Sequence, residues 1–223
     1  MLEETVLKVA GWARKHPVWF CWIYFLIYMG WFTALEKFRE PVLIVHSRLD
    51  DIIPFVPVFI VPYLIWFFYI ALTSFWFFRH SREDFWNVCR YMCTGMIIAL
   101  AIYTILPTGL HLRQAVTGTD IFSRMVAMLY HTDTATNVCP SIHVMNSIAV
   151  NAVVQRSNAF RHPKIIKISS YILAVSICAS TVLLKQHSVI DVFWAIILEV
   201  MLYSLSYRPF FERSTVMESK KAV

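Results

Sequence analysis

Residues 61–78 read VPYLIWFFYIALTSFWFF, and no residue in this stretch is charged. A run of this length and apolarity can cross the hydrocarbon core of a bilayer as a helix. Lipid offers no hydrogen-bond partners to backbone N–H and C=O groups, so a spanning segment of this kind must satisfy its own backbone. The stretch therefore predicts a helical membrane protein.

The composition of the whole chain agrees with this prediction. Of its 223 residues, 58% are hydrophobic and 15% are charged, and the mean hydropathy is +0.59. A soluble domain has roughly 25% charged and 45–50% apolar residues, so these values exclude an ordinary soluble protein. Long apolar runs between short polar turns favour helices over a membrane barrel.

The apolar runs predict an all-α polytopic fold with six transmembrane helices. The predicted spans are 17–36, 54–78, 88–107, 140–156, 165–184 and 188–207. Pro54, Pro57 and Pro62 predict an irregular start for the second span. The fourth span is short and carries amide and hydroxyl side chains, so we expect it to face other helices. Without repeats or linkers, we expect one domain over residues 1–223.

The distribution of Lys and Arg predicts the orientation. With the N-terminus inside, most of the 20 Lys and Arg residues fall in inner segments, so both termini are expected in the cytoplasm. Segment 37–53 is then expected in the outer interface, and 115–131 as an amphipathic helix over the outer mouth. The net charge of +6 lies in juxtamembrane loops without a nucleic-acid motif. The expected partners are therefore membrane lipids, not nucleic acid.

Three polar clusters fall at the outer face in this topology. They are LPTGLHLRQ (106–114), CPSIH (139–143) and STVLLKQHSVID (180–191). His187 and Asp191 are four residues apart at the start of a helix, so the carboxylate can reach a ring nitrogen. This contact would leave the other nitrogen as a base or nucleophile. A pair that only pins the helix end agrees with the same spacing.

The other two clusters contain groups that suit a phosphate. Pro140 fits the first turn of a helix, whose N–H groups and partial positive charge attract an anion. Ser141 adds a hydroxyl and His143 an acid. Arg113 matches phosphate oxygens in bidentate geometry, and Lys185 adds a point charge. Taken one at a time, these residues also fit roles as helix caps or interfacial side chains.

Taken together, the clusters resemble the type 2 phosphatidic acid phosphatase superfamily. That family carries KxxxxxxRP, PSGH and SRxxxxxHxxxD in this order on a six-helix membrane core. PSIH resembles the second motif with Ile142 in place of glycine. The serine, histidine and aspartate of the third motif match Ser180, His187 and Asp191.

The chain also departs from the family pattern. Leu106 stands where the first motif has lysine, and Gln114 replaces its proline. Thr181 replaces the arginine of the third motif. Arg113 remains, so two phosphate-binding cations of the family are missing. We expect Lys185 to compensate in part.

The resemblance implies a mechanism and a set of site residues. His187, oriented by Asp191, attacks phosphorus, and His143 protonates the leaving alkoxide before water hydrolyses the phosphohistidine. The phosphoryl oxygens are held by Arg113, Ser141, Ser180 and Lys185. The family needs no metal or cofactor, and the sequence has no carboxylate cluster typical of a two-metal site.

These observations predict a metal-independent lipid phosphate phosphatase, a hydrolase with an extracytoplasmic site. The expected substrate is a phosphatidate, phosphatidylglycerophosphate or polyprenyl type of monoester or pyrophosphate. Size and simplicity favour a bacterial cell membrane, although an endomembrane with a lumenal site agrees with the same sequence. The missing cations favour an alternative, a headgroup phosphotransferase similar to sphingomyelin and inositol-phosphorylceramide synthases. A non-catalytic lipid-binding or transport protein is a third reading, but the chain has only 5 glycines to break helices at mid-membrane.

Two further features are expected to serve packing. Glu199 lies inside the sixth span, where a carboxylate is expensive, and we expect it to be protonated or hydrogen-bonded. The cysteines form no C-x-x-C pair, and Cys139 is the one that lies beside the polar clusters.

Overall fold

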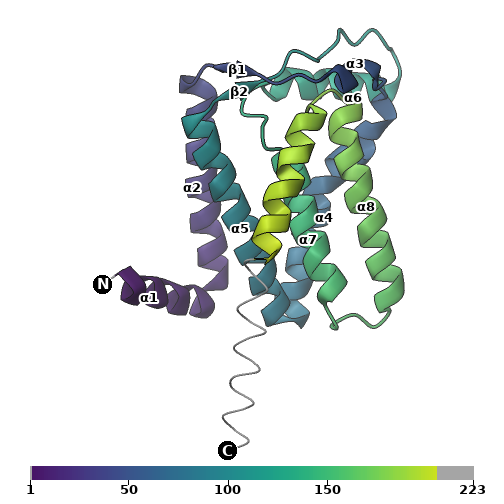
Figure 1. Cartoon of the computed structure of the whole chain (residues 1–223). Helices are drawn as coiled ribbons and strands as arrows, with labels where there is room; N and C mark the ends of the chain where they lie inside the picture. The colour runs from purple at the N-terminus through teal and green to yellow at the C-terminus, as the bar shows by residue number, and fades with distance from the viewer. Residues whose placement is uncertain (1, 205–223) are drawn as a thin grey trace, which may run out of the picture. The chain divides into compact units, whose positions relative to one another are not determined.

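The computed structural model describes residues 2–204 and is mostly helical (Figure 1). The end of the predicted 188–207 span lies outside the described residues. The same holds for the basic C-terminal residues that entered the orientation prediction, Arg208, Arg213, Lys220 and Lys221. The chain divides into two compact units, Met1–Arg39 and Glu40–Val223.

The first unit consists of two helices, α1 (Leu2–Lys15) and α2 (Pro17–Phe38). Pro17 begins α2, where the N–H that proline lacks would have no helical partner. The backbone N–H of Arg39 donates to Leu35 O at 3.0 Å and closes the helix. No charged residue lies in α2 before its last turn, as its role as the first predicted span requires.

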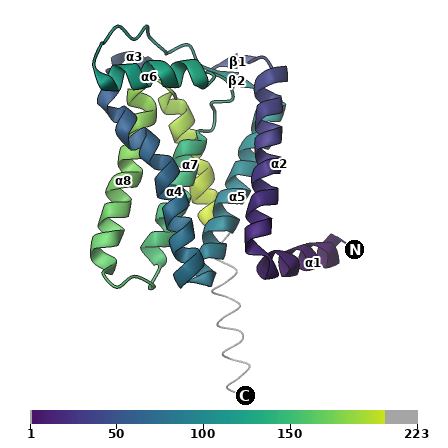
Figure 2. The ribbon, with the colours of Figure 1, turned by 180° about the vertical axis from the view of Figure 1, so that it is seen from behind.

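The second unit contains the remaining elements. They are β1 (Leu43–Ile44), α3 (Arg48–Ile52), the 3-10 turn η1 (Pro57–Phe59), α4 (Ile60–His80), α5 (Arg82–Ile105), β2 (Thr108–Gly109), α6 (Ile121–Thr132), α7 (Ile142–Arg156) and α8 (Pro163–Leu183). A final helix covers 189–204 within the described residues. Helices α4, α5, α7, α8 and the final helix run side by side as a bundle (Figures 1 and 2).

Helix α7 lies inside this bundle and packs against α4, α5 and α8. Its buried residues include polar ones, among them Asn146 and Ser147. The segment predicted as the fourth span therefore packs against other helices, as expected. The buried Glu199 on the final helix lies next to α5, because a Cβ added at Gly95 would be 2.9 Å from Glu199 Oε1.

Four helices in the described part of the chain are long and apolar enough to cross a membrane. They cover Pro17–Phe38, Pro57–His80, Arg82–Ile105 and Pro163–Leu183. The second starts with η1, so the irregular start that its prolines predicted is confirmed. The third begins at Arg82, not at 88, because the Ser81 hydroxyl accepts the N–H of Asp84 and caps the helix there.

The helices that correspond to the other two predicted spans are shorter. Helix α7 has 15 residues, and the described part of the final helix is 189–204. At about 1.5 Å per residue, α7 is about 22 Å long, less than the roughly 30 Å of a hydrocarbon core.

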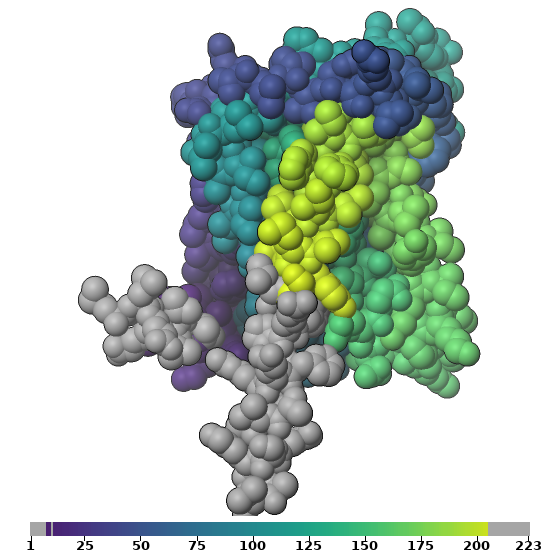
Figure 3. Space-filling model, in the orientation of Figure 1, coloured from purple at the N-terminus to yellow at the C-terminus, as the bar shows by residue number. Residues whose placement is uncertain are grey.

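One end of the bundle is covered by the connecting segments. Strand β1 pairs in parallel with β2, and α6 runs across the same end (Figure 2). Segment 40–56 lies over the end of the final helix (Figure 3). The predicted amphipathic helix over 115–131 is wrong at its start: α6 begins at Ile121, because Asp120 Oδ1 accepts the N–H groups of Phe122 and Ser123.

Candidate active site

His187 directly follows the turn that ends α8. This turn is a Schellman motif, in which the N–H of Lys185 donates to Val182 O (3.0 Å) and the N–H of Gln186 to Thr181 O (2.9 Å). The N–H of His187 donates to the same Thr181 oxygen at 3.0 Å. The end of α8 thus fixes the backbone from which the imidazole projects.

Asp191 contacts His187 as their four-residue spacing predicted. Its Oδ2 lies 3.3 Å from His187 Nδ1 and also accepts the N–H of Ser188 at 2.9 Å. Asp191 is fully buried, and His187 is 8% exposed. With Nδ1 at the carboxylate, Nε2 is the nitrogen left to act as a nucleophile.

His143 lies next to His187, as the second residue of α7. The centroids of the two imidazole rings are 6.0 Å apart. Tyr63 and Trp66 of α4 pack on His143, with ring centroids at 4.5 and 4.2 Å. His143 Nε2 is buried and has no hydrogen-bond partner. A phosphoryl group placed beside the two rings could contact both histidines.

Ser141 caps helix α7. Its hydroxyl oxygen accepts the N–H of Val144 at 3.5 Å, and its own N–H donates to Asp191 O at 3.3 Å. Pro140 lies one residue before this cap, so its predicted place in the first helical turn is wrong. Instead, its carbonyl accepts the Tyr103 hydroxyl. The hydrogen bond from Ser141 to Asp191 joins the second cluster to the third at the start of α7.

Arg113 reaches the site but is already extensively bonded. Its Nη1 donates to the carbonyl oxygens of Tyr130 (3.4 Å) and Asp133 (2.6 Å). Its Nη2 donates to Thr134 O (3.0 Å), Asp133 Oδ2 (3.4 Å) and Gln186 Oε1 (2.5 Å). Nε is buried without a partner. A bidentate contact with phosphate through both terminal nitrogens would have to displace some of these bonds.

The two other predicted phosphate-binding residues also make internal hydrogen bonds. Lys185 is 3% exposed, and its Nζ donates to Asp50 O (2.6 Å) and Ile53 O (2.5 Å). Ser180 is fully buried, and its hydroxyl donates to Ile177 O at 2.6 Å. An ammonium has three N–H donors, so one remains on Lys185 for another acceptor.

Asp50 contacts the segment after His187, and the sequence marks it only as the capping-box partner of Ser47 at the start of α3. Its Oδ2 accepts the Ser188 hydroxyl (2.6 Å), and its Oδ1 accepts the N–H of Val189 (2.9 Å). A carboxylate at the start of the final helix is stabilised by the partial positive charge there. Asp50 and Asp191 together hold the segment that follows His187.

Two buried amides near the clusters were missed as well. Asn137 is 5% exposed in a left-handed conformation (φ 55°), and its Nδ2 has no partner. Gln186 is 2% exposed, and its Nε2 has no partner. No motif marks either residue; the one signal for Gln186 was its place directly before His187.

Cys139 lies beside the polar clusters, and its thiol is affected by burial and by Asp191. Burial, together with the nearby Asp191 carboxylate, raises the pKa of Cys139 to about 12. The thiol is therefore protonated at neutral pH, in agreement with a packing role. Within residues 2–204, no group of three or more His, Cys, Asp or Glu side chains has the arrangement of a metal site.

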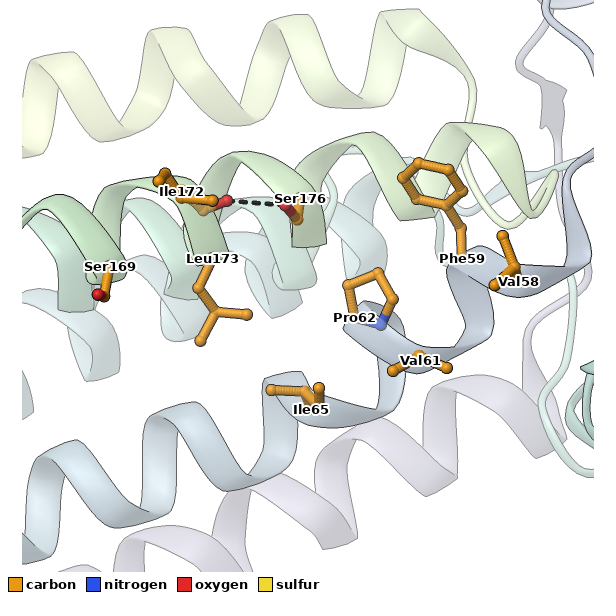
Figure 4. A pocket seen from close by; sticks show the side chains of 9 residues that line it. All are labelled: Val58, Phe59, Val61, Pro62, Ile65, Ser169, Ile172, Leu173 and Ser176. Carbon is orange, nitrogen blue, oxygen red and sulfur yellow. Dashed lines mark hydrogen bonds between the residues drawn. The ribbon is translucent and has the colours of Figure 1, made fainter.

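An apolar groove of about 590 Å³ lies between α4 and α8 (Figure 4). Its lining comprises Val58, Phe59, Val61, Pro62, Ile65, Ser169, Ile172, Leu173 and Ser176. At one end, Phe59 packs against the buried cluster that includes Tyr63 and Leu184. Tyr63 in turn stacks on His143, so one helix, α4, borders both the groove and the histidine pair.

The two histidines, one held by a carboxylate, form an arrangement that can donate and accept protons and attack an electrophile. Comparisons with protein-family models, curated proteins and solved structures find no match to this chain.

Proposed function

We propose that this protein is a membrane-embedded enzyme that hydrolyses a lipid phosphate ester through a phosphohistidine at His187. The observation that carries the proposal is that the His143 and His187 ring centroids are 6.0 Å apart, with Asp191 Oδ2 at 3.3 Å from Nδ1 of His187. The apolar helices and the groove support a lipid as the substrate. The resemblance to the phosphatidic acid phosphatase motifs supports the reaction.

In the proposed reaction, His187 Nε2 forms a bond to phosphorus as the bond to the ester oxygen breaks. His143, which takes up a proton when the phosphate anion binds beside it, gives this proton to the leaving alkoxide. Water then attacks phosphorus, His143 takes a proton from it, and His187 leaves. The net change is ester plus water to alcohol plus phosphate, and each residue returns to its starting state.

The proposed topology has six spans, with both termini in the cytoplasm. The histidine pair lies at the bundle end that β1, β2, α3 and α6 cover, whereas the basic turns 79–82 and 156–164 join helices at the other end (Figure 1). A site at the extracytoplasmic face agrees with the positive-inside rule. We place the protein in a bacterial cell membrane on the grounds of its size.

Phosphate release from a panel of lipid phosphates, with purified protein in detergent and EDTA, tests the proposal. We expect release by the wild type, none by His187→Ala, and a rate reduced about 10²- to 10⁴-fold in His143→Ala. His162→Ala, at the exposed start of α8, is the matched control and should keep full activity. Equal release by His187→Ala and wild type would disprove the phosphohistidine.

A second candidate is transfer of the phospho-headgroup to an alcohol. The observation that favours it is the engagement of both nearby cations: Arg113 binds three carbonyl oxygens and Asp133, and Lys185 binds two carbonyl oxygens. A site with little uncommitted positive charge is poorly suited to a doubly charged monoester. Product formation only after addition of an alcohol acceptor would identify transfer.

A further inference from the structure

Gln186 lies in the Schellman motif that ends α8, directly before His187. Its backbone N–H and that of His187 donate to the same carbonyl oxygen, that of Thr181, at 2.9 and 3.0 Å. The side chain is 2% exposed. The Gln186 amide is therefore held on the same turn as the proposed nucleophile.

The orientation of the Gln186 amide follows from the chemistry of its neighbour. A guanidinium has only N–H donors, so the group that faces Arg113 must be the amide oxygen. The distance from Arg113 Nη2 to Gln186 Oε1 is 2.5 Å. Nε2 is thus the opposite end of the amide, and it points away from Arg113.

Gln186 Nε2 is buried without a hydrogen-bond partner, and so are Arg113 Nε and His143 Nε2. Buried donors of native proteins are nearly always satisfied, so each exception calls for a ligand or a functional reason. Gln186 directly precedes His187 in the chain and accepts a hydrogen bond from Arg113, and the rings of His143 and His187 are 6.0 Å apart. Two of the three nitrogens, the guanidinium and amide N–H groups, can only donate, which matches an oxyanion.

Arg113 has little else to offer an anion, because its terminal nitrogens hold the 130–134 segment and Gln186. A further donor close to His187 is needed to hold a phosphoryl group in line for attack. The neutral amide of Gln186 is placed to supply it. It stands one residue from His187 and bonds directly to the guanidinium of Arg113.

We propose that Gln186 is a substrate-contacting residue, whose Nε2 donates to a non-bridging phosphoryl oxygen while its Oε1 holds Arg113. This inference rests on the proposed function. The ligand it takes is a phosphoryl oxyanion, whose negative charge is spread over these oxygens in the transition state.

Gln186→Glu tests the contact, because glutamate keeps an oxygen for Arg113 and replaces only the donating NH₂ by a charged oxygen. We expect the variant to keep its thermal stability but to bind orthovanadate, a phosphate analogue, at least about 10-fold more weakly, and to lose about 10²-fold in kcat/KM. A residue that served only to hold Arg113 would change both quantities only through the repulsion of the added charge, which Gln186→Asn does not introduce. Wild-type vanadate affinity in Gln186→Glu would therefore overturn the proposal.

Two more variants keep the test decisive. Gln186→Asn keeps a neutral amide but shortens its reach, so vanadate binding is expected to weaken in this variant as well. It replaces Gln186→Glu as the test if the glutamate variant does not fold. Asn87→Asp makes the same amide-to-acid change at the far end of α5 and should leave binding unchanged. If the wild type shows no His187-dependent turnover, the proposed function is wrong. If the wild type does show it, and the Gln186 variants have the same vanadate affinity and kcat/KM as the wild type, only the role of Gln186 is wrong.

Discussion

Lys185 shows how the end of α8 is stabilised. It has a φ of 52°, in the left-handed region that glycine usually supplies at this position of a Schellman motif. Its ammonium offsets this strain through hydrogen bonds to Asp50 O and Ile53 O. We expect Lys185→Met to destabilise the fold by about 1–3 kcal/mol, because two buried carbonyls lose their donor.

Thermal unfolding of Lys185→Met in detergent measures this effect, with Lys164→Met in the exposed first turn of α8 as the control. If the remaining donor of Lys185 also contacts phosphate, as the sequence predicts, the KM rises as well. An unchanged melting temperature would contradict the structural role, and an unchanged KM would contradict compensation for the missing cations.

The alkylation rate of Cys139 can be used to detect the negative charge of Asp191. The raised pKa of this thiol, about 12, predicts slow alkylation at pH 8, because only the thiolate reacts. A nearby negative charge raises a thiol pKa, so Asp191→Asn should lower it and speed alkylation at pH 8. The measurement is the rate of iodoacetamide labelling against pH in a variant with the other four cysteines replaced by alanine. Equal rates with and without Asp191→Asn would show that Asp191 does not act on Cys139.

Among individual residues, the sequence alone predicted the contact between His187 and Asp191. His187 and Asp191 are four residues apart, and a local rule describes their contact. Asp50 lies 138 residues from the Ser188 hydroxyl that it accepts, and Gln186 lies 73 residues from Arg113. Such contacts depend on how the chain folds back, and no local pattern predicts them.

The short helix α3 is linked to the final helix through one residue, Asp50. Asp50 accepts hydrogen bonds from Ser188 and Val189 and so joins α3 to the final helix. Asp50→Ala should destabilise the protein by about 2–3 kcal/mol, because these donors lose a charged partner. The neighbouring Asp51 is exposed and contacts His46 at the surface, so Asp51→Ala should change stability by less than about 0.5 kcal/mol.

Unfolding of the two variants can be followed by circular dichroism under identical detergent conditions. Because Asp50 also fixes the turn after His187, activity in Asp50→Ala is expected to fall more than the loss of stability explains. Similar unfolding curves for both variants would show that the link between α3 and the final helix contributes little.

The groove between α4 and α8 makes a prediction about the lipid chain. Leu173→Trp would fill part of its approximately 590 Å³. If a substrate chain lies there, the kcat/KM for long-chain phosphates should fall by about 10-fold or more, whereas short-chain substrates should be unaffected. Tyr171→Trp, on an exposed part of α8 outside the groove lining, is the control. Equal losses for short and long chains would exclude the groove as the chain site.

Helix positions followed from hydropathy, but helix ends did not. Ser81 caps α5, which begins at Arg82, six residues before the predicted start, and Asp120 caps α6, which begins at Ile121, six residues after the predicted start. In both cases a side-chain cap, not the end of the hydrophobic pattern, decides the boundary. The polar first turn of α5 is invisible to a hydropathy window, whereas the prediction for α6 ran through residues 115–120, before its cap; both helices were therefore found, but their starts were wrong.

Within the second unit, the arrangement of the bundle separates two kinds of surface. The connections that carry the histidine pair gather at one end, and the basic turns lie at the other (Figure 1). Alternation of helix direction alone puts them there, because α4–α5 and α7–α8 are each joined by a short turn. For this reason, the order of the predicted helices was sufficient to predict that three polar clusters, far apart in the sequence, lie at the same end of the bundle. The membrane side that each end faces rests on the charge rule alone.

Accessibility of single cysteines would decide that orientation. Thr117→Cys is exposed in the segment before α6, and His162→Cys is exposed in the turn before α8, at the opposite end. In intact cells, with the native cysteines replaced by alanine, a membrane-impermeant maleimide should label position 117 and reach position 162 only after permeabilisation. The reverse pattern would place the histidine pair on the cytoplasmic side. The substrate would then have to be a phosphate of the inner leaflet, and the charge asymmetry would need a cause other than the positive-inside rule.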